Sequence, residues 1–380
     1  MSSHPPVSRP HPLRIVHVVD SLEVGGLERV TADLAMAQHQ AGHRVTVFSL
    51  FTTDGLKAEL QQAGIEVIEG HKRASLDRGA LSLLRRTLRQ QRAHIVHAHN
   101  FVPNYHAALA GLGLSARQVC TLHDMGSRLV NPRLRRLFKL SLLRTHQVAM
   151  VGSQVHRQHT GSGLVPSARA HVVLNGIPVE RFEGSAQARS KARAELGLGS
   201  DDLVIGCVGR LVPLKNHHRM IEVMPRLLAR HPDLRLLIIG DGERATALRE
   251  LVDGMQLGKR VILAGQRQNV GTLLPALDIF ALPSQTEGLS IALLEACATG
   301  LAVVATQVGG NVEIIHDNQT GLLIPADDND ALFCALDRLA SDAGLRRELG
   351  HRASTWVRDN ASVQALMKAY EHVYQAALPG

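Results

Sequence analysis

The sequence predicts an α/β protein made of two doubly wound parallel sheets, one in each half of the chain. The 380 residues, with a mass of 41.2 kDa, exceed what one hydrophobic core usually organises. Short apolar runs alternate with helix-length segments, which is typical of parallel sheets with crossover helices. The alternation stops after residue 178 and starts again at Leu203, so we expect two domains.

The first half opens with an apolar run over residues 13–19, a Gly25-Gly26 turn and a helical pattern over 27–40. These features predict a strand, a loop and a helix. Further short runs of strand composition follow, most of them separated by helix-length segments: 45–48, 66–68, 95–97, 119–122, 148–151 and 172–174. We predict a first Rossmann-like domain over residues 1–178.

The second half begins with a stretch rich in Ala, Arg, Ser and Gly, which we interpret as a linker. Strand-like runs then follow at 203–209, 236–239, 261–263, 279–282, 302–305 and 321–324. They predict a second Rossmann-like domain over residues 179–361. The last segment, from residue 362, carries an apolar stripe at helical spacing and predicts a helix with one buried side. In such sheets ligands bind beyond the carboxyl ends of the strands, so functional residues should lie in the loops there.

Composition excludes several classes of protein. Hydrophobic residues make up 45% and charged residues 20% of the chain, as in ordinary globular proteins. No apolar run approaches the roughly 20 residues needed to span a bilayer, and no apolar segment of a signal peptide follows the polar start. The four cysteines lie far apart without zinc-ligand spacing. We expect a protein of the cytoplasm, peripheral at most on the inner face of the cell membrane.

Positive charge is concentrated in the first half of the chain. Residues 1–180 have a net charge of +10 and the remaining residues −2. Segments 83–92 and 133–144 mix Arg or Lys with apolar residues at helical spacing, a pattern that suits an anionic membrane surface. Solvated faces of two helices explain it equally well. Nucleic acid fits less well, because only 3% of residues are aromatic and no nucleic-acid motif accompanies the charge.

The strongest candidate site lies between residues 283 and 296. Glu287 follows a predicted strand, and Glu295 lies eight residues later on a predicted helix, roughly 12 Å further along. The two carboxylates could hold different parts of one elongated ligand. The backbone amides between them would be the free donors of a helix N-terminus, which suits a phosphate: Gly288, Leu289 and Ser290.

A pair of cations lies in the loop after the first strand of the second domain. Arg210 and Lys215 would face the same cleft as Glu287. A diphosphate leaving group gains negative charge as its bond breaks, and fixed cations would stabilise that transition state. Taken alone, an arginine and a lysine in one loop are more often exposed surface residues without a role in binding.

The segments GRLVPLKN, IIGDGE and SQTEGLSIALLEACATGLAVVAT, with Gly309-Gly310 and Glu313 beyond them, resemble the retaining glycosyltransferases of family 4. The similarity runs from Arg14 to about Ala377 and is most specific between Val208 and Pro325. It implies the GT-B fold of two Rossmann-like domains, a terminal helix that returns to the first domain, and no metal or other cofactor. It also implies that Glu295 holds the nucleotide ribose, that Glu287 contacts the transferred sugar, and that Arg210 and Lys215 lie on the diphosphate.

The first half resembles the family less closely. Residues 24–30 are similar to its glycine-rich loop, which implies that Gly26 lies near the donor phosphate and that Gly25 and Gly26 lie near the acceptor. Glycine permits such an approach because it has no Cβ. Residues 121–124 resemble the motif whose histidine lies beside the reacting sugar, which implies that role for His123. Taken as a lone residue, His123 would more often be a structural loop histidine.

His97 and His99 share one face of a predicted strand and could suggest metal ligands. No third ligand stands at a convincing spacing, so we predict no metal site and expect His99 to lie near the acceptor instead. Residues 327–330 read Asp-Asp-Asn-Asp. They precede a helical pattern, and we interpret them as N-capping charge rather than a metal motif.

The residues and the resemblance together predict a retaining hexosyltransferase with a UDP or GDP sugar as donor and a glycan or lipid-linked acceptor. The sequence also looks broadly like sugar transferases of bacterial exopolysaccharide loci, including a group linked to an exosortase system. Two alternatives remain open from the sequence. One is a nucleotide-sugar epimerase of the same fold, and the other is a non-catalytic sugar-binding or lipid-binding scaffold.

Overall fold

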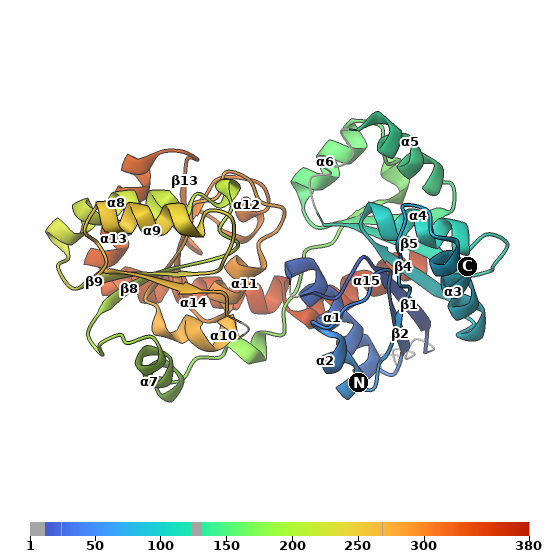
Figure 1. Ribbon diagram of the computed structural model, residues 1–380, viewed down its shortest axis with the longest axis horizontal. Helices are drawn as coiled ribbons and strands as arrows, with labels where there is room; N and C mark the ends of the chain where they lie inside the picture. The colour runs from blue at the N-terminus through green and yellow to red at the C-terminus, as the bar shows by residue number, and fades with distance from the viewer. Residues whose placement is uncertain (1–11, 24, 124–130, 268, 380) are drawn as a thin grey trace, which may run out of the picture.

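The computed structural model describes residues 12–23, 25–123, 131–267 and 269–379, which form two lobes side by side (Figure 1). Each lobe contains one parallel sheet, so the predicted fold class is confirmed. The first sheet has the order β3-β2-β1-β4-β5-β6-β7. Its strands are β1 (Arg14–Val19), β2 (Arg44–Ser49), β3 (Glu66–Glu69), β4 (Ile95–His99), β5 (Arg117–Leu122), β6 (Thr145–Met150) and β7 (Ala170–Val172).

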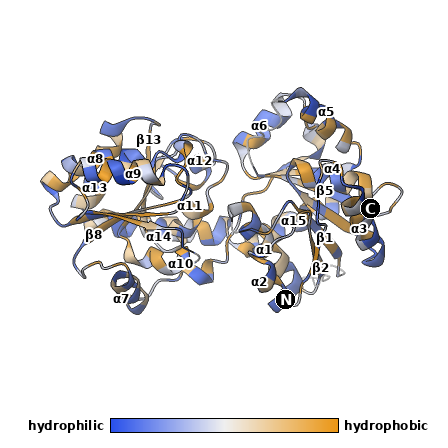
Figure 2. Cartoon of the chain, in the orientation of Figure 1, coloured by the Kyte–Doolittle hydropathy of each residue, from blue (hydrophilic) through white to orange (hydrophobic). Residues whose placement is uncertain are grey.

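Helices connect these strands and cover both faces of the sheet (Figure 1). Most residues of the inner strands are buried, which is why these strands read as continuous apolar runs in the sequence. Figure 2 shows apolar strands between helices with one apolar side. The helices are α1 (Gly26–Gln40), α2 (Lys57–Gln62), α3 (Arg78–Gln90), α4 (Phe101–Ala110), α5 (Pro132–Ser141), α6 (Ser153–Gly161) and the short η2 (Ser167–Arg169).

The second sheet repeats the arrangement with the order β10-β9-β8-β11-β12-β13. Two hydrophobic clusters lie on its two faces, formed by alternating residues of the same strands, for example Val204 and Ile205 of β8. The strands are β8 (Leu203–Val208), β9 (Leu234–Ile239), β10 (Val261–Gly265), β11 (Ile279–Leu282), β12 (Ala302–Thr306) and β13 (Leu322–Ile324).

The helices of the second half include the predicted one after Asp327. Asp328 caps it, because its side chain accepts a hydrogen bond from the backbone N–H of Ala331. These helices are η3 (Val179–Phe182), α7 (Ala186–Glu195), η4 (Pro213–Lys215), α8 (His217–Arg230), α9 (Ala245–Gly254), α10 (Val270–Leu273), η5 (Leu274–Ala276), α11 (Ile291–Ala298), α12 (Asn311–Ile314), α13 (Asn329–Ser341), α14 (Ala343–Asn360) and α15 (Val363–Ala377).

Helix α15 returns to the first lobe, as the resemblance implied (Figure 1). Its apolar stripe packs against the first sheet and α1. The chain makes this return where Ile177 and Ser362 form a parallel β-bridge. The buried α15 residues of this core are Leu366, Tyr370, Val373, Tyr374 and Ala377. The first lobe therefore takes part of its core from the end of the chain.

In both sheets the connections run in opposite directions from the central strands, β1 and β4 in one and β8 and β11 in the other. Ligands of such sheets bind beyond the carboxyl ends of strands at these switch points. The loops of the two lobes meet there. A Cβ on Gly26 would lie 3.3 Å from the Ile291 side chain, and one on Gly288 would lie 2.8 Å from the carbonyl oxygen of His123.

In the structure, the two basic segments of the first lobe contain both buried and exposed side chains. In α5, Phe138 is buried, and Leu134 and Leu137 pack partly against the same core. The Arg144 guanidinium donates to the carbonyl oxygens of Leu114 and Ala116. The hypothesis that segment 133–144 faces a membrane is therefore wrong for these four side chains.

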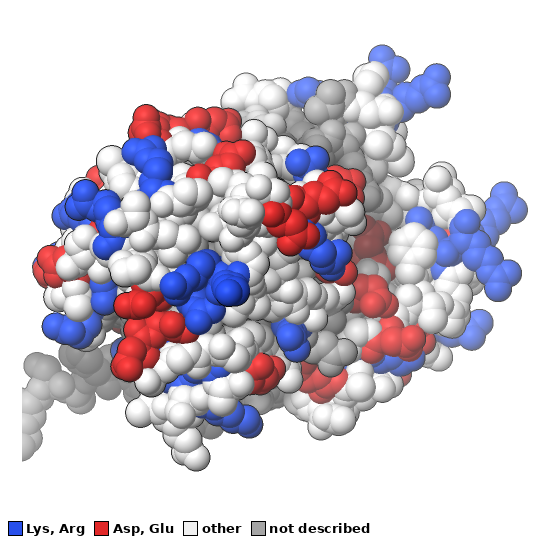
Figure 3. Space-filling view, turned by 60° about the vertical axis from the view of Figure 1, so that its left-hand side comes forward, with Lys and Arg blue, Asp and Glu red and all other residues white. Residues whose placement is uncertain are grey.

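Other members of these segments face solvent. Arg133, Arg136, Lys139 and Leu140 are exposed on α5. In α3, Arg86 and Arg89 are exposed, while Arg85 donates to the carbonyl oxygens of Ala110 and Leu112. Figure 3 shows basic side chains at the outer edge of the first lobe and mixed charges over the second. Among the described residues, no helix is long and apolar enough to cross a bilayer.

Candidate active site

Lys215 and Glu287 meet in the second lobe. The strand β8 ends before Arg210, and η4 then turns the chain so that Lys215 projects toward the loop after β11. Lys215 Nζ lies 2.6 Å from Glu287 Oε1. The Ser284 hydroxyl donates to the same oxygen at 2.6 Å. The Glu287 side chain is only 8% exposed. Lys215 balances its charge, and the Ser284 hydroxyl adds a hydrogen bond.

A glycine turn fixes the loop that carries Glu287. Gly309 has a left-handed φ of +51°, and a Cβ there would lie 1.7 Å from the carbonyl oxygen of Glu287. The N–H of Gly310 donates to the carbonyl oxygen of Gly288 at 2.6 Å. The Gly309-Gly310 pair is therefore needed for the close approach of two loops, which holds Glu287 in place.

Helix α11 begins later than the sequence suggested. Ser290 is its N-cap, and its hydroxyl accepts from the Leu293 N–H at 3.3 Å. The N-terminal amides of the helix are therefore those of Ile291 and Ala292, with Gly288 and Leu289 in the preceding loop. We correct the interpretation of residues 288–290 as the helix terminus, although the loop still leads into the positive end of the α11 dipole.

Glu295 occupies a different environment from Glu287. It lies on α11, near Asp33 and Arg29 of α1 in the first lobe. Burial raises the pKa of Glu295 to about 7, with a further increase from the Asp33 charge and an opposing effect of Arg29. Asp33 itself pairs with Arg29 at 2.7 Å and with Arg181 at 2.9 Å. The two glutamates thus have different neighbours: Glu287 pairs with Lys215 of its own lobe, and Glu295 lies near charged side chains of the first lobe.

The opposite wall of the site comes from the first lobe. Gly25 precedes α1 and Gly26 is its first residue, next to Ile291 across the lobes. Arg210 is exposed and close enough to Glu28 of α1 to affect it: burial raises the pKa of Glu28, and the Arg210 charge opposes that shift. Arg210 therefore lies within electrostatic range of α1, the helix that begins at the glycine loop.

His123 follows β5, and its backbone N–H donates to Asn100 Oδ1 at 2.8 Å. Asp124, the last residue of its motif, lies outside the described residues. Burial lowers the pKa of His123 to about 3, so its ring is neutral. Its carbonyl oxygen faces Gly288 of the second lobe. The structure thus brings His123 beside the loop of Glu287, as the predicted site requires.

His99 does not line the site. Its side chain is 2% exposed, and its Nδ1 lies 3.1 Å from His123 Nε2, behind that ring. We therefore correct its assignment to the acceptor.

The sequence reasoning also missed His17, whose ring on β1 lies next to His97 and His99. The only sequence signal for it was a histidine inside an apolar strand.

The three buried histidines His17, His97 and His99 bring ring nitrogens within 4.8 Å of one another, a spacing that could suit a metal ion. Each of their six ring nitrogens, however, lies within hydrogen-bond distance of a protein atom. A cation could bind only after several of these bonds broke. The arrangement is a hydrogen-bond network, and its partners favour that interpretation over a metal centre.

A second contact joins the lobes beside the site. The Glu313 carboxylate of α12 accepts from the backbone N–H of Ser153 and, at 3.0 Å, from the Ser153 hydroxyl. Ser153 is the first residue of α6, so the carboxylate lies at a helix N-terminus, where negative charge is favourable. This contact stabilises the arrangement of the two lobes in which the loops meet.

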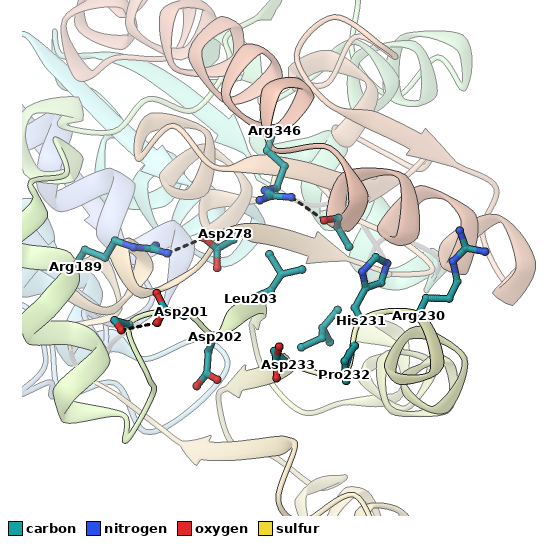
Figure 4. A pocket seen from close by; sticks show the side chains of 13 residues that line it. Arg189, Asp201, Asp202, Leu203, Arg230, His231, Pro232, Asp233, Asp278 and Arg346 are labelled. Carbon is teal, nitrogen blue, oxygen red and sulfur yellow. Dashed lines mark hydrogen bonds and ion pairs between the residues drawn. The ribbon is translucent and has the colours of Figure 1, made fainter.

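A pocket of about 440 Å³ lies away from these loops, beside Leu203 and Leu234 at the amino ends of β8 and β9 (Figure 4). Arg189 there pairs with Asp278 at 2.7 Å, and Arg346 donates to the carbonyl oxygen of Ala340 at 3.0 Å. A second pocket, of about 570 Å³, lies beside α7 and α10. Neither contains a residue of the candidate site.

Comparisons with known proteins find matches to both halves of the chain. The family model described as "Glycosyltransferase Family 4" matches residues 24–181, and the one described as "Glycosyl transferases group 1" matches 188–356. The chain is 30% identical over 281 residues to the D-inositol 3-phosphate glycosyltransferase of Corynebacterium jeikeium, covering 70% of this chain and 67% of that protein.

A mannosyltransferase of Mycolicibacterium smegmatis, named as GDP-mannose-dependent and acting on phosphatidylinositol monomannoside, is 32% identical over 219 residues. That match covers 55% of this chain, and the chain spans only 56% of the relative. Among solved structures, Anabaena Alr3699/HepE in complex with UDP superposes with a TM-score of 0.85 at 21% identity, covering 95% of this chain and 99% of that one. At this identity, the similarity to Alr3699/HepE shows a shared fold and no more.

Proposed function

The chain belongs to glycosyltransferase family 4 and has the GT-B fold, and from this premise we propose that it is a retaining hexosyltransferase. Its donor is a nucleotide-diphosphate sugar. Its acceptor is a glycan or lipid-linked sugar of cell-surface polysaccharide synthesis. The observation that carries the proposal is the contact of Lys215 with the buried Glu287, in a loop that lies against His123 of the other lobe.

The donor would lie along the second lobe. Glu295 would accept hydrogen bonds from the ribose hydroxyls, and Arg210 and Lys215 would bind the diphosphate. The N-terminal amides of α11 would add donors to a phosphate oxygen. Glu287 and His123 would then contact the hexosyl group. This order follows the chain from Glu295 on α11 to Glu287 in the loop before it.

Transfer would take place on the face of the sugar that carries the leaving group. The bond from the anomeric carbon to the phosphate oxygen breaks, and the acceptor oxygen forms its new bond on the same face. The acceptor proton passes to the departing phosphate oxygen, so charge and atoms balance without an enzymic nucleophile. Arg210 and Lys215 stabilise the negative charge that develops on the diphosphate.

We propose that this reaction needs no metal ion, because two side-chain cations and helix-terminal amides already supply positive charge at the diphosphate. Transfer activity should therefore persist in the presence of a chelator. A loss of activity on chelation that Mg²⁺ or Mn²⁺ restores would contradict this part of the proposal.

The acceptor would enter from the first lobe, past Gly25 and Gly26. A lipid-linked acceptor requires that this lobe reaches an anionic membrane. The exposed cations of α5 support such a surface, and beside them Leu140 is 63% and Leu143 is 83% exposed. Each Lys or Arg near an anionic bilayer contributes on the order of 1 kcal/mol. We therefore propose peripheral binding through α5.

Thermal unfolding with a panel of nucleotides and nucleotide sugars tests donor binding. Relatives are named with GDP-mannose and solved with UDP-glucose, so uridine and guanosine donors both belong in the panel. A ligand present at 100 times its dissociation constant should stabilise the protein by roughly 2.7 kcal/mol. No shift with any member of the panel would contradict a donor site.

A transfer assay distinguishes the proposed transferase from the two alternatives, an epimerase and a binding scaffold. Donor consumption that depends on added acceptor, with a product of unchanged anomeric configuration by NMR, supports the proposal. Conversion of the donor to an epimer without acceptor would identify an epimerase. A protein that binds the donor but neither transfers nor slowly hydrolyses the sugar would be a binding scaffold.

A further inference from the structure

A line of buried polar side chains crosses the first lobe from His123 to α15. His17, His97 and His99 lie side by side on β1 and β4, with His17 paired in register to His97. The three rings are almost completely buried, and neighbouring ring centroids lie 4.2 to 5.4 Å apart along the series from His17 to His123. Because buried polar atoms are nearly always hydrogen-bonded, each nitrogen of these rings is expected to have a partner.

The partners form one continuous chain with Gln38 of α1 at its centre. In one direction Gln38 Oε1 lies 2.8 Å from His17 Nε2, His17 Nδ1 lies 3.0 Å from His99 Nε2, and His99 Nδ1 lies 3.1 Å from His123 Nε2. Thr31 Oγ1, which donates to the Leu27 carbonyl oxygen, lies 3.3 Å from the same His99 nitrogen.

In the other direction Gln38 Nε2 donates to the Tyr374 hydroxyl at 3.1 Å. That hydroxyl lies 2.8 Å from His97 Nδ1, and His97 Nε2 lies 2.7 Å from the Thr121 hydroxyl. The Thr121 hydroxyl meets that of Tyr370 at 2.7 Å. The Gln38 amide therefore points its nitrogen to Tyr374 of α15 and its oxygen to His17 of β1.

This orientation determines where each proton lies. An amide oxygen can only accept, so His17 must carry its proton on Nε2 and leave Nδ1 bare. The bare Nδ1 of His17 then accepts from His99 Nε2–H, and the bare Nδ1 of His99 accepts from His123 Nε2–H. A neutral imidazole has only one ring proton, so His123 Nδ1 is left as an acceptor.

The charge state of the rings agrees with this ordering. Burial lowers the pKa of His17 to about 4 and that of His123 to about 3, and it lowers the pKa values of His97 and His99 well below the usual range. All four rings are neutral near pH 7, so each has a defined tautomer. His123 Nδ1 is buried and has no hydrogen-bond partner among the described residues.

We infer that Gln38 is a positioning residue: through His17 and His99 it fixes His123 in the Nε2–H tautomer, so that Nδ1 offers a lone pair to a hydroxyl group of the bound sugar. The identity of that ligand rests on the proposed function, whereas the tautomer does not. A fixed acceptor selects a sugar with a hydroxyl at that position, because the analogue that lacks it leaves a buried nitrogen unpaired. The buried network is in this way connected to donor specificity.

NMR of the full chain labelled with ¹⁵N in its histidine rings tests this inference directly. Long-range proton–nitrogen correlations distinguish a protonated ring nitrogen from a bare one, and His123→Asn assigns the signals. We expect a protonated Nε2 and a bare Nδ1 in His123 near pH 7. A protonated Nδ1 in the unmodified protein would overturn the inference, whatever the enzyme activity.

Gln38→Met removes the acceptor at nearly constant volume. We expect the fixed tautomer of His123 to be lost and kcat/KM to fall roughly 5- to 100-fold while the protein stays folded, since a buried group loses its defined partner. Gln38→Asn, which withdraws the amide by one methylene, is the second variant if Gln38→Met does not fold. Retention of the single Nε2–H tautomer in a folded Gln38 variant would overturn the role of Gln38.

Tyr370→Phe is the matched control. It removes a buried hydroxyl from α15 and from the same network, but it leaves Gln38, His17 and His99 in contact. We expect its His123 tautomer to be unchanged. If no nucleotide sugar is turned over by any protein in the series, the proposed function fails, while the NMR result still decides the tautomer.

Discussion

Lys215 Nζ lies 2.6 Å from Glu287 Oε1, although 72 residues separate them in the chain. The lysine side chain is 21% exposed and the glutamate 8%. Lys215 can therefore reach a ligand in the cleft while it balances a nearly buried carboxylate. Removal of one partner of such a pair leaves the other charge without compensation.

Lys215→Ala should lower kcat by roughly a hundredfold or more, because the diphosphate loses a cation as its charge develops. It should also reduce the free energy of unfolding by about 1–3 kcal/mol, because the Glu287 carboxylate loses a charged donor. Steady-state kinetics and denaturant unfolding measure the two effects. The double variant Lys215→Ala/Glu287→Gln should regain stability but not turnover. Recovery of turnover in it would assign Lys215 a structural role only.

Arg210→Ala should also lower kcat by roughly a hundredfold. Its side chain is exposed, so the free energy of unfolding should change by less than about 0.5 kcal/mol. Arg249→Ala, on the exposed face of α9, is the control and should affect neither quantity. A loss confined to KM would indicate binding of the ground state instead of stabilisation of the transition state.

Binding of the nucleotide sugar should depend on the ionisation of Glu295. Its pKa of about 7 lies above the usual value of 4.5, so the carboxyl group is mostly protonated at pH 6 and mostly ionised at pH 8. The ionised form is the stronger acceptor for ribose hydroxyls. Affinity measured by calorimetry should therefore rise between pH 6 and pH 8 and level off above.

Glu295→Gln should remove that dependence on pH, and Glu295→Ala should cost roughly 1.5–3 kcal/mol of binding free energy at pH 8. The ligand in this measurement should be the nucleotide sugar and not the free nucleoside diphosphate. The terminal phosphate of the free diphosphate titrates in the same pH range as Glu295 and would add its own pH dependence. An equally steep pH profile in folded Glu295→Gln would remove Glu295 from the donor site.

Truncation after Asp359 should abolish activity and unfold the first lobe. Helix α15 supplies buried side chains to that core, and Tyr374 is a partner of both Gln38 and His97. Leu366→Ala is the milder change and should cost about 2–5 kcal/mol, as large-to-small core substitutions do. Lys368→Ala, exposed on the same helix, is the control. A truncated protein with full turnover would show that α15 is dispensable.

Vesicle co-sedimentation should detect binding to anionic lipid at low salt that weakens as salt is added. Changing Arg133, Arg136 and Lys139 to Glu should release the protein, because these are exposed cations of α5. The matched control changes three exposed cations of the second lobe to Glu: Arg249, Lys259 and Arg347. Protein that stays in the supernatant with anionic vesicles at low salt would favour a water-soluble acceptor.

The amino-acid sequence by itself determined the fold class and nearly every strand. Both sheets are parallel and covered by helices, so their strands are buried on both faces and read as short apolar runs between helix-length segments. The cap at Asp328 and the stripe of α15 could be predicted for the same reason, because each depends on residues three or four positions apart. Local patterns decide local structure.

Only the tertiary structure decided which distant side chains meet. The Lys215–Glu287 pair, the place of His17 beside His97 and His99, and the contact of Glu313 with Ser153 depend on strand order and on how the lobes approach each other. Tertiary structure also placed His99 behind His123 and tied Arg144 to backbone carbonyls. The local sequence around a histidine in a strand, or an arginine in a basic helix, does not show whether the side chain lines a cleft or lies in a core. Its role is decided by the partners that folding brings within hydrogen-bond distance.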